Sequence, residues 1–490
     1  TGNLNKYDVF NGQLGKKITS AIHGDSIKPL IKSDGKLDSS VLGLWTGGVE
    51  GKLPLGTSIN SKSKRTIFTN RQIDSNNQAI SSQTLTQVNL ETLFDADATK
   101  AKFKNDQQKN YWLNALGYKV DVSSNVTFAS LPTEERRKLG SVMHSKPILL
   151  TQSGDIDPTQ TSITTSNRED YLLFGTTQGA LHVVDDNGVE KFTFIPHEMM
   201  NKQKEAFLDD SASNKGNTNE IFYGIDGQWT AFTQYVTDAN GKFTVKKIKR
   251  TLNEQEIEYS GLQWVYGGLR MGGRSYYALD LSDIDKPILK FHIDPDSALN
   301  ADKTDDVNNP LAYMGESWSK PTVGYINWEG KKTLVMVEGG GYHRGYENPE
   351  YNSDDIGVKK GAGIYIFNAN DGSLLWWGGV NATKTKWSEA YTTNSDMKYS
   401  VVSQVNAIDR DSDGLLDNLY FGDLGGQIFR IDINNKALNK NNTVHRIVKL
   451  YGFSEADKIK PRFYEMPSFS VEKGVDGLYG VIAAVSGDRS

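Results

Sequence analysis

The 490-residue sequence contains no cysteine, which excludes disulfides, thiolate metal sites and cysteine nucleophiles. It also has no run of about eighteen apolar residues, so we expect no helix that crosses a membrane. The 55 Lys and Arg are balanced by 60 Asp and Glu, for a net charge of −5. This balance offers no basic surface for nucleic acid. The lack of cysteine fits a secreted protein as readily as a cytosolic one.

Motifs of the common enzyme classes are absent too. The segment from His197 to Asn201 has the first His-Glu of a zincin helix but lacks its final histidine. No Walker motif and no GxSxG nucleophile turn occurs, and the seven histidines are scattered. We therefore predict a non-enzymatic protein, with no catalytic residues and no organic cofactor site.

What the sequence does contain is an acidic stretch from Asp409 to Asp417. Aspartates occupy its positions 1, 3, 5 and 9 and glycine its position 6, as in the first part of an EF-hand-type calcium loop. Four carboxylates so close together repel one another unless a cation neutralises them, and oxygen ligands in a flexible loop favour Ca²⁺ over Mg²⁺ or zinc. The predicted ligands are Asp409, Asp411, Asp413, the Leu415 carbonyl and, directly or through water, Asp417.

This loop departs from a complete EF-hand in two ways. Position 12 is Tyr420, so the closing glutamate is missing, and the flanking residues are typical of β-strands, not helices. We expect the loop to join two strands. The alternative is an acidic surface turn that binds no ion. A calcium site of this kind favours a location outside the cell, where calcium is plentiful.

A second pattern is a repeat of glycine, any residue, an apolar residue, two residues, an apolar residue and aspartate. Each copy resembles a strand entered through a glycine turn, and a β-meander repeated at intervals of tens of residues is typical of a β-propeller. Unrelated hairpins in two sandwiches are the alternative. The copies are Gly2–Asp8, Gly179–Asp185 and Gly426–Asp432, with looser ones at Gly273–Asp280 and Gly363–Asn368; Ser145-Lys146-Pro147 and Ser319-Lys320-Pro321 form a further echo.

The chain ends predict how the ring closes. Residues 2–8 hold only the second half of a repeat and residues 479–488 only a first half, so pairing of the N- and C-terminal strands would complete one blade. We expect irregular insertions, among them residues 342–360, and a few short helices. These helices are predicted over 99–116, 133–139 and 196–208.

Several stretches together resemble the PilC/PilY family of type IV pilus biogenesis factors and tip adhesins. The strongest is Met397-Lys398-Tyr399-Ser400, the acidic loop, and then the run from Tyr420 to Arg430. The resemblance implies a modified β-propeller of about seven blades. It also implies that residues 1–490 are a single C-terminal domain without the N-terminal region of the full-length protein. By matching positions, the resemblance also implies the five calcium ligands named above, Asp409, Asp411, Asp413, the Leu415 carbonyl and Asp417.

The resemblance further implies a role: the domain supports pilus biogenesis by opposing retraction, with calcium control of twitching motility and adhesion. Its partners would be pilus components such as minor pilins at the pilus tip, and possible host-cell surfaces. Its location would be the cell surface, the pilus and the outer membrane. Two alternatives stay open: a quinoprotein-like dehydrogenase propeller, and a propeller that binds carbohydrate or a host receptor.

Overall fold

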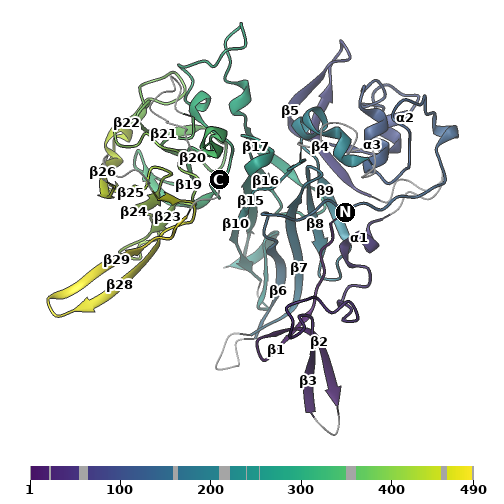
Figure 1. Cartoon of the computed structure of the whole chain (residues 1–490), viewed down its shortest axis with the longest axis horizontal. Helices are drawn as coiled ribbons and strands as arrows, with labels where there is room; N and C mark the ends of the chain where they lie inside the picture. Colours follow the sequence, from purple (N-terminus) through teal and green to yellow (C-terminus); the bar gives the residue numbers. More distant parts are fainter. Residues whose placement is uncertain are drawn as a thin grey trace. The chain divides into compact units, whose positions relative to one another are not determined.

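The computed structural model describes residues 2–20, 24–54, 65–157, 164–208, 221–238, 240–252, 254–348, 360–453 and 461–487 (Figure 1). Most of the insertion at 342–360 therefore lies outside the described residues. The chain separates into two compact units, which are described individually. Unit 1 comprises Thr1–Ile225, Gln234–Gly261 and Ser282–Lys286, and unit 2 comprises Asp226–Thr233, Leu262–Leu281 and Pro287–Ser490. Our expectation of one domain over 1–490 stays a prediction.

Unit 1 is built on an eight-stranded sheet with the order β11-β12-β6-β7-β8-β9-β4-β5. These strands are, in chain order, β4 (Ile67–Ile73), β5 (Ala79–Val88), β6 (Ile148–Asp157), β7 (Thr164–Thr176), β8 (Ala180–Asp185), β9 (Glu190–Phe194), β11 (Val236–Thr237) and β12 (Lys242–Thr244). A three-stranded sheet and a hairpin add β1 (Asp8–Phe10), β2 (Gln13–Ser20), β3 (Gly24–Pro29), β13 (Lys247–Leu252) and β14 (Gln255–Ser260). The α-helices are α1 (Gly48–Lys52), α2 (Leu90–Phe94), α3 (Lys109–Ala115) and α4 (His197–Lys202).

Unit 2 contains three larger sheets, in the orders β10-β15-β16-β17, β18-β19-β20-β21-β22 and β23-β24-β25-β26. The first two comprise β10 (Trp229–Gln234), β15 (Leu262–Gly268), β16 (Tyr276–Asp280), β17 (Ile288–Ile293), β18 (Thr322–Trp328), β19 (Lys331–Gly339), β20 (Ile364–Asn368), β21 (Leu374–Gly379) and β22 (Ala390–Thr393). The third comprises β23 (Asn406–Ile408), β24 (Asn418–Gly422), β25 (Ile428–Ile433) and β26 (Val444–Tyr451). Two-stranded pairs follow: β27 (Arg462–Phe463) with β30 (Ser486–Gly487), and β28 (Ser468–Gly474) with β29 (Gly477–Ala483).

The predicted repeat marks the same place in four of these sheets. Its copies form β8, β16, β20 and β25, and each is the third of four successive neighbouring strands. The glycines before β8, β20 and β25 have φ of +86°, +90° and +79°, a backbone conformation that favours glycine and turns the chain into the strand. The described residues thus contain four meanders of the kind expected for propeller blades, while the predicted number of about seven stays a prediction.

The repeated Ser-Lys-Pro motif has a clear structural cause. Each proline directly precedes the first strand of a meander, β6 or β18, as proline does where no ladder N–H is needed. The buried Ser145 hydroxyl accepts a hydrogen bond from the N–H of Gly175 at 2.8 Å, and that of Ser319 accepts one from Gly339 at 2.9 Å. The serine therefore fastens the entry of its meander to the end of the second strand.

The cores lie between the sheets. One cluster in unit 2 combines apolar side chains of β18–β21 with those of β24 and β25, among them Val335, Trp376 and Phe421. A second combines β15, β16 and β17 with β19 and β20, including Tyr266 and Met336. Because each strand contributes alternate residues, a sheet packs on both faces where it has a neighbour on both sides.

Other predictions need correction. The helix expected over 99–116 is only α3, because the Asp106 carboxylate accepts the Gln108 N–H at 2.9 Å and ends the preceding turns. The helix expected over 133–139 is absent: the Arg136 N–H donates to the Gly117 carbonyl at 2.9 Å in an extended pairing. The helix expected over 196–208 is confirmed as α4 and a following 3₁₀ turn.

The N-terminal copy of the repeat behaves differently from the others. Residues 2–7 are not a strand, and Gly2 donates instead to the Leu139 carbonyl at 2.9 Å. Among the described residues β1 pairs with β2 and β30 with β27, so pairing of the two chain ends is not confirmed. No helix among these residues is long and apolar enough to cross a membrane.

Candidate metal centre

The acidic stretch connects β23 to β24, as expected from the strand-like flanks. The two strands pair antiparallel from Asn406 opposite Tyr420 to Ile408 opposite Asn418. Leu419 of β24 lies in the core shared with the β18–β22 sheet and is 1% exposed. Both ends of the loop are therefore fixed by sheet and core, whereas the loop itself reaches the surface.

Three of the predicted ligands lie together. Carboxylate oxygens of Asp409, Asp411 and Asp413 are all within 4.8 Å of one another. The loop curls tightly because Ser412 and Gly414 have φ of +62° and +83°. The Asp409 oxygens accept the N–H groups of Asp413 (3.2 Å) and Gly414 (2.8 Å), which holds the first carboxylate over the bend. Asp411 and Asp413 are exposed and Asp409 is half-buried, so an ion could enter from solvent.

Asp417 occupies a different place. Its carboxylate is not in the three-aspartate group of the described residues; it accepts the Arg410 N–H at 2.8 Å and the side-chain amide of Asn435 at 3.3 Å. Its backbone pairs with Ile408 and Ile433, both at 2.8 Å. Asp417 thus spans the base of the loop, and its role as a ligand stays a prediction, as does that of the Leu415 carbonyl.

The structure adds residues that the loop sequence does not contain. The Leu416 N–H donates to the Tyr325 carbonyl of β18 at 2.7 Å, and the Leu416 carbonyl accepts the side-chain amide of Asn435 at 3.0 Å. A Cβ on Gly324 would lie 2.9 Å from the Leu416 side chain, so glycine there leaves room for it. No sequence pattern links these positions, because they lie roughly 20 to 90 residues from the loop and meet it only through sheet packing.

The donor set fits a hard divalent cation. It offers the carboxylate oxygens of three aspartates, with no imidazole or thiolate in the three-residue group. One cation of the chain lies close by: the Lys332 ammonium is 3.6 Å from the position of a Cβ on Gly414. Among the described residues, this ammonium and the neighbouring Arg410 do not fully compensate the three converging aspartates, so the loop retains an excess of negative charge that calcium would neutralise.

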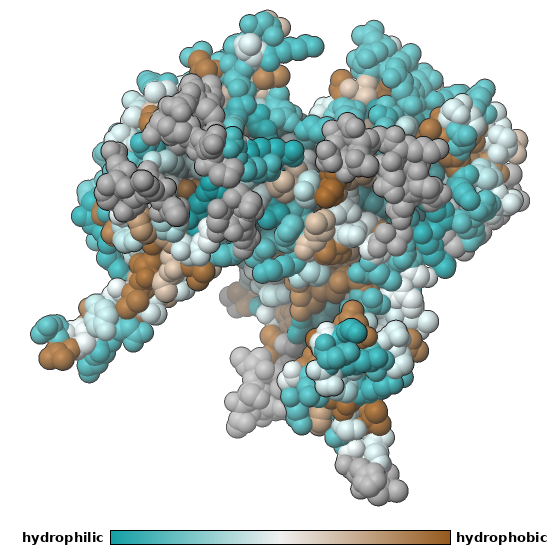
Figure 2. Space-filling model, viewed as in Figure 1, coloured by the Kyte–Doolittle hydropathy of each residue, from teal (hydrophilic) through white to brown (hydrophobic). Residues whose placement is uncertain are grey.

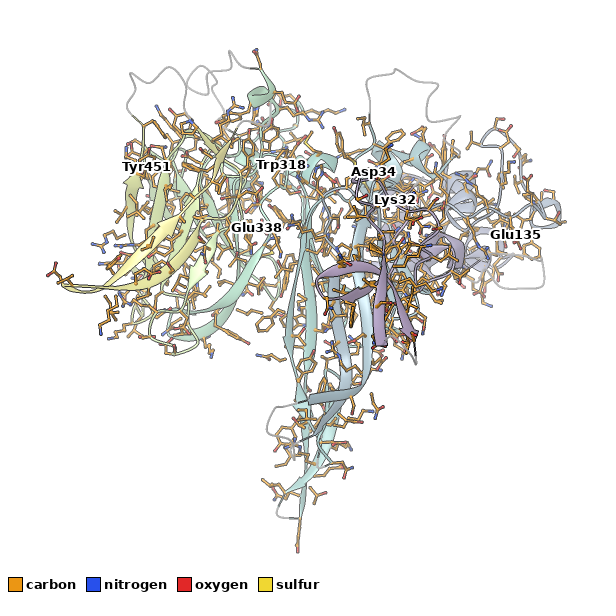
Figure 3. The ribbon with its side chains drawn as sticks, turned by 60° about the horizontal axis from the view of Figure 1, so that its bottom comes forward. Lys32, Asp34, Glu135, Trp318, Glu338 and Tyr451 are labelled. Atoms are coloured by element: carbon orange, nitrogen blue, oxygen red, sulfur yellow. The ribbon has the colours of Figure 1, made fainter. Side chains whose placement is uncertain are left out.

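A buried acid outside the loop, Glu338, belongs to no sequence motif and could not be predicted from the sequence. Glu338 of β19 (labelled in Figure 3) is 0% exposed, and burial raises its pKa well above the usual range. The Tyr276 hydroxyl beside it donates to the Ser319 carbonyl at 2.9 Å. Burial thus favours the protonated form of Glu338 within the sheet packing, and Glu338 is not among the three converging aspartates.

Comparison with known proteins supports the fold. The family model of the PilY1 beta-propeller domain matches residues 150–470, which include the acidic loop and, apart from the first two residues of β6, all four meanders. The chain is 23% identical over 275 residues to the "Type IV pilus biogenesis factor PilY1 homolog" of Xylella fastidiosa, covering 55% of this chain and 14% of that protein. It is 25% identical over 311 residues to "Type IV pilus biogenesis factor PilY1" of Pseudomonas aeruginosa, covering 60% and 21%.

Among solved structures, the crystal structure of the Pseudomonas aeruginosa PilY1 C-terminal domain matches with a TM-score of 0.40 and 20% identity, over 66% of this chain and 53% of that one. The chain spans about a fifth or less of the length of the two full-length relatives. The family match covers well over half of the chain and includes the third strand of every meander described above. The chain therefore belongs to the PilY1 beta-propeller domain family.

Proposed function

We propose that this chain is a calcium-binding interaction domain of a type IV pilus biogenesis factor. The observation that carries the proposal is the convergence of Asp409, Asp411 and Asp413 within 4.8 Å on a loop whose ends are fixed by β23 and β24. The excess negative charge of this loop is costly unless it is neutralised. Calcium, when bound, supplies that neutralisation.

In this proposal some residues bind the ion and others hold the loop in place. Asp409, Asp411, Asp413 and the Leu415 carbonyl would hold the ion. The Asp417 carboxylate keeps the base of the loop closed, because it accepts hydrogen bonds from the Arg410 N–H and from the side-chain amide of Asn435. Because the bases of β23 and β24 are already paired, the ion would order the loop without being needed for the sheet.

The wider role follows from the names of the relatives and from the resemblance of the sequence. We propose that the domain contacts pilus components, supports pilus biogenesis by opposing retraction, and makes twitching motility and adhesion dependent on calcium. This role is non-enzymatic and places the domain at the cell surface, on the pilus or at the outer membrane. The family membership supports this proposal most directly.

Calorimetric titration with calcium tests the ion site. Asp409→Ala and Asp413→Ala should abolish binding, whereas Asp371→Ala, in an exposed turn of the same unit, should leave it unchanged. Unchanged calcium affinity in both loop variants would refute the assignment. A pulldown of pilus components with calcium and with EDTA tests the role. A quinone absorbance spectrum of the purified chain would instead favour the dehydrogenase alternative.

A further inference from the structure

A cleft of about 470 Å³ lies beside the acidic loop, within unit 2. Its volume is in the range of roughly 300–1,000 Å³ typical of ligand sites. One wall is the face of the β23–β26 sheet that points away from the core, and the other is the β28–β29 ribbon. The function proposed above does not use this cleft, although Ile408, Arg410 and Asp417 contribute to both the cleft and the loop region.

The sheet wall is polar and ordered by strand register. Side chains from all four strands form one row along it: Ile408, Asn418, Asp432 and Arg446. Tyr420 and Arg430 form the next row. The alternating residues Leu419 and Ile431 point into the core on the opposite face. The register thus fixes the spacing of the groups that a ligand would meet.

The ribbon wall is apolar. The Phe469 ring of β28 stacks on Tyr420 at a centroid distance of 5.4 Å, and the Asn406 amide donates to the Pro467 carbonyl at 2.8 Å, so the base of the ribbon is held to the sheet. Beyond this base, Val471 and Leu478 are 58% and 75% exposed. Figure 2 shows apolar residues (brown) at the base and tip of the ribbon. A two-stranded ribbon alone is marginally stable in water, so its uncovered apolar surface favours a binding partner.

The charges of the cleft favour an anion. Arg410, Arg430 and Arg446 line it together with two acids, Asp417 and Asp432. Asp432 is engaged by two of these arginines, Arg430 and Arg446, each at 2.7 Å. The guanidinium of Arg410 is exposed, and no ion pair of it is found within the described part of the chain. The cleft therefore presents the exposed Arg410 next to an apolar wall.

We propose that this cleft binds an extended peptide segment of a partner protein, with an acidic side chain on Arg410 and a neighbouring apolar side chain against Phe469 and the ribbon. Charge complementarity supports the acidic side chain, since a guanidinium and a carboxylate pair through two parallel hydrogen bonds. The apolar residues of the ribbon, Phe469 and Ile482 in the cleft and Val471 beyond it, support a peptide over a small ion, because a small ion would leave them uncovered.

The cleft and the ion site are coupled through Arg410, and this part rests on the proposed function. Arg410 lies between Asp409 and Asp411 in the chain, and its N–H is held by Asp417. Uncompensated aspartates there would repel an acidic peptide, and calcium would remove that repulsion. Calcium should therefore tighten peptide binding, and the peptide should tighten calcium binding by the same factor.

A library of random linear heptapeptides, selected on the chain at millimolar calcium, tests the proposal. We expect the selected peptides to share Asp or Glu next to Phe, Leu, Ile or Val. In fluorescence anisotropy, Arg410→Gln should weaken their binding about fivefold, as for a partly exposed ion pair. Lys303→Gln, which removes an exposed charge elsewhere on the same unit, should not. Both variants should keep the melting temperature of the parent chain.

The outcomes separate the two proposals. Failure to select any peptide, selected peptides without an acid, or undiminished binding to Arg410→Gln would overturn the cleft proposal while leaving the calcium site standing. Self-association of the chain that Arg410→Gln abolishes would assign the cleft to a second copy and overturn it too. Peptide binding that depends on Arg410 in a chain that titration shows to bind no calcium would support the cleft and overturn the calcium site.

Discussion

Two sheets of unit 2 that share a core join their first and second strands in different ways. In the β18–β22 sheet the connection is the two-residue turn Glu329-Gly330, with φ of +50° and +79°. In the β23–β26 sheet it is the acidic loop from Asp409 to Asp417. Two residues with positive φ suffice to close a hairpin, because their twist matches that of the strands. The fold therefore does not require the longer loop.

The difference lies in charge as well as length. The short turn carries one acid, whereas the long loop brings three carboxylates within 4.8 Å of one another. Such an arrangement raises the free energy of the isolated chain, and a fold gains nothing from it unless a cation binds. The core between the sheets therefore supports the structure, whereas the hairpin does not need the additional residues of the acidic loop.

The largest expected effect separates core from loop. Phe421 of β24 is 0% exposed in the core that both sheets share. Phe421→Ala should lower the free energy of unfolding by about 3–5 kcal/mol, because it leaves a cavity in a packed cluster. Urea denaturation in EDTA measures this. If Asp411→Ala lowered the free energy of unfolding as much, the loop would be part of the structural support and the comparison would fail.

The next effect concerns calcium alone. Asp411→Ala removes one of the three converging carboxylates and should weaken calcium binding by a factor of about 100, measured by calorimetry. Glu329→Ala, in the short turn, is the matched control and should leave the affinity unchanged. Equal losses in the two variants would show that general surface charge, and not the loop, attracts the ion.

In contrast to the acids of the loop before β24, Asp423, directly after β24, is buried. Burial raises the pKa of Asp423 to about 7, although it accepts hydrogen bonds from the Gly425 and Gln427 N–H groups. An acid with a raised pKa in the folded state favours folding while protonated, so its stability contribution is lost as pH rises from about 4 to 7.

The free energy of unfolding should therefore fall by about 2 kcal/mol between pH 5 and pH 7 because of Asp423. Urea denaturation of the parent chain and of Asp423→Asn, both in EDTA, measures this dependence. The variant should show a smaller fall over the same interval. An equal fall in both proteins would assign the pH dependence to other groups, such as the buried Glu338, whose pKa is also raised by burial.

The smallest effect is the sharpest test of the comparison. Gly414 and Gly330 have almost the same φ, +83° and +79°, and both have room for a Cβ. Gly414→Ala and Gly330→Ala should each cost about 1 kcal/mol of stability, since alanine is strained at positive φ. Only Gly414→Ala should also weaken calcium binding. Thermal unfolding and calorimetry on the pair would contradict this if both variants, or neither, changed the affinity.

Local patterns were sufficient to find the repeated strands and the loop. The Gly…Asp repeat predicts β8, β16, β20 and β25 because a strand entered through a glycine turn and left through a polar turn is specified within seven or eight residues. The spacing of Asp409, Asp411 and Asp413 predicts their convergence for the same reason: a bend with glycine at its sixth position brings alternate side chains together.

Local patterns failed where a distant partner decides the conformation. The helix predicted over 99–116 begins only at Lys109, because Asp106 is buried against Arg71, with two contacts of 2.8 Å, and is not free to lie on a helix surface. The N-terminal repeat copy, Gly2–Asp8, has the right residues but pairs with other segments of unit 1. In both cases long-range contacts outweigh a weak local preference.

The sequence by itself determined the strand-rich, repeated architecture, the family and the three aspartates that meet at one bend, because each of these depends on residues close together in the chain. Only the tertiary structure placed Asp417 at the base of the loop, fastened Leu416 to Tyr325 through a 2.7 Å hydrogen bond and built the cleft beside Arg410. These features join strands that are far apart in sequence, and the packing of whole sheets fixes their register.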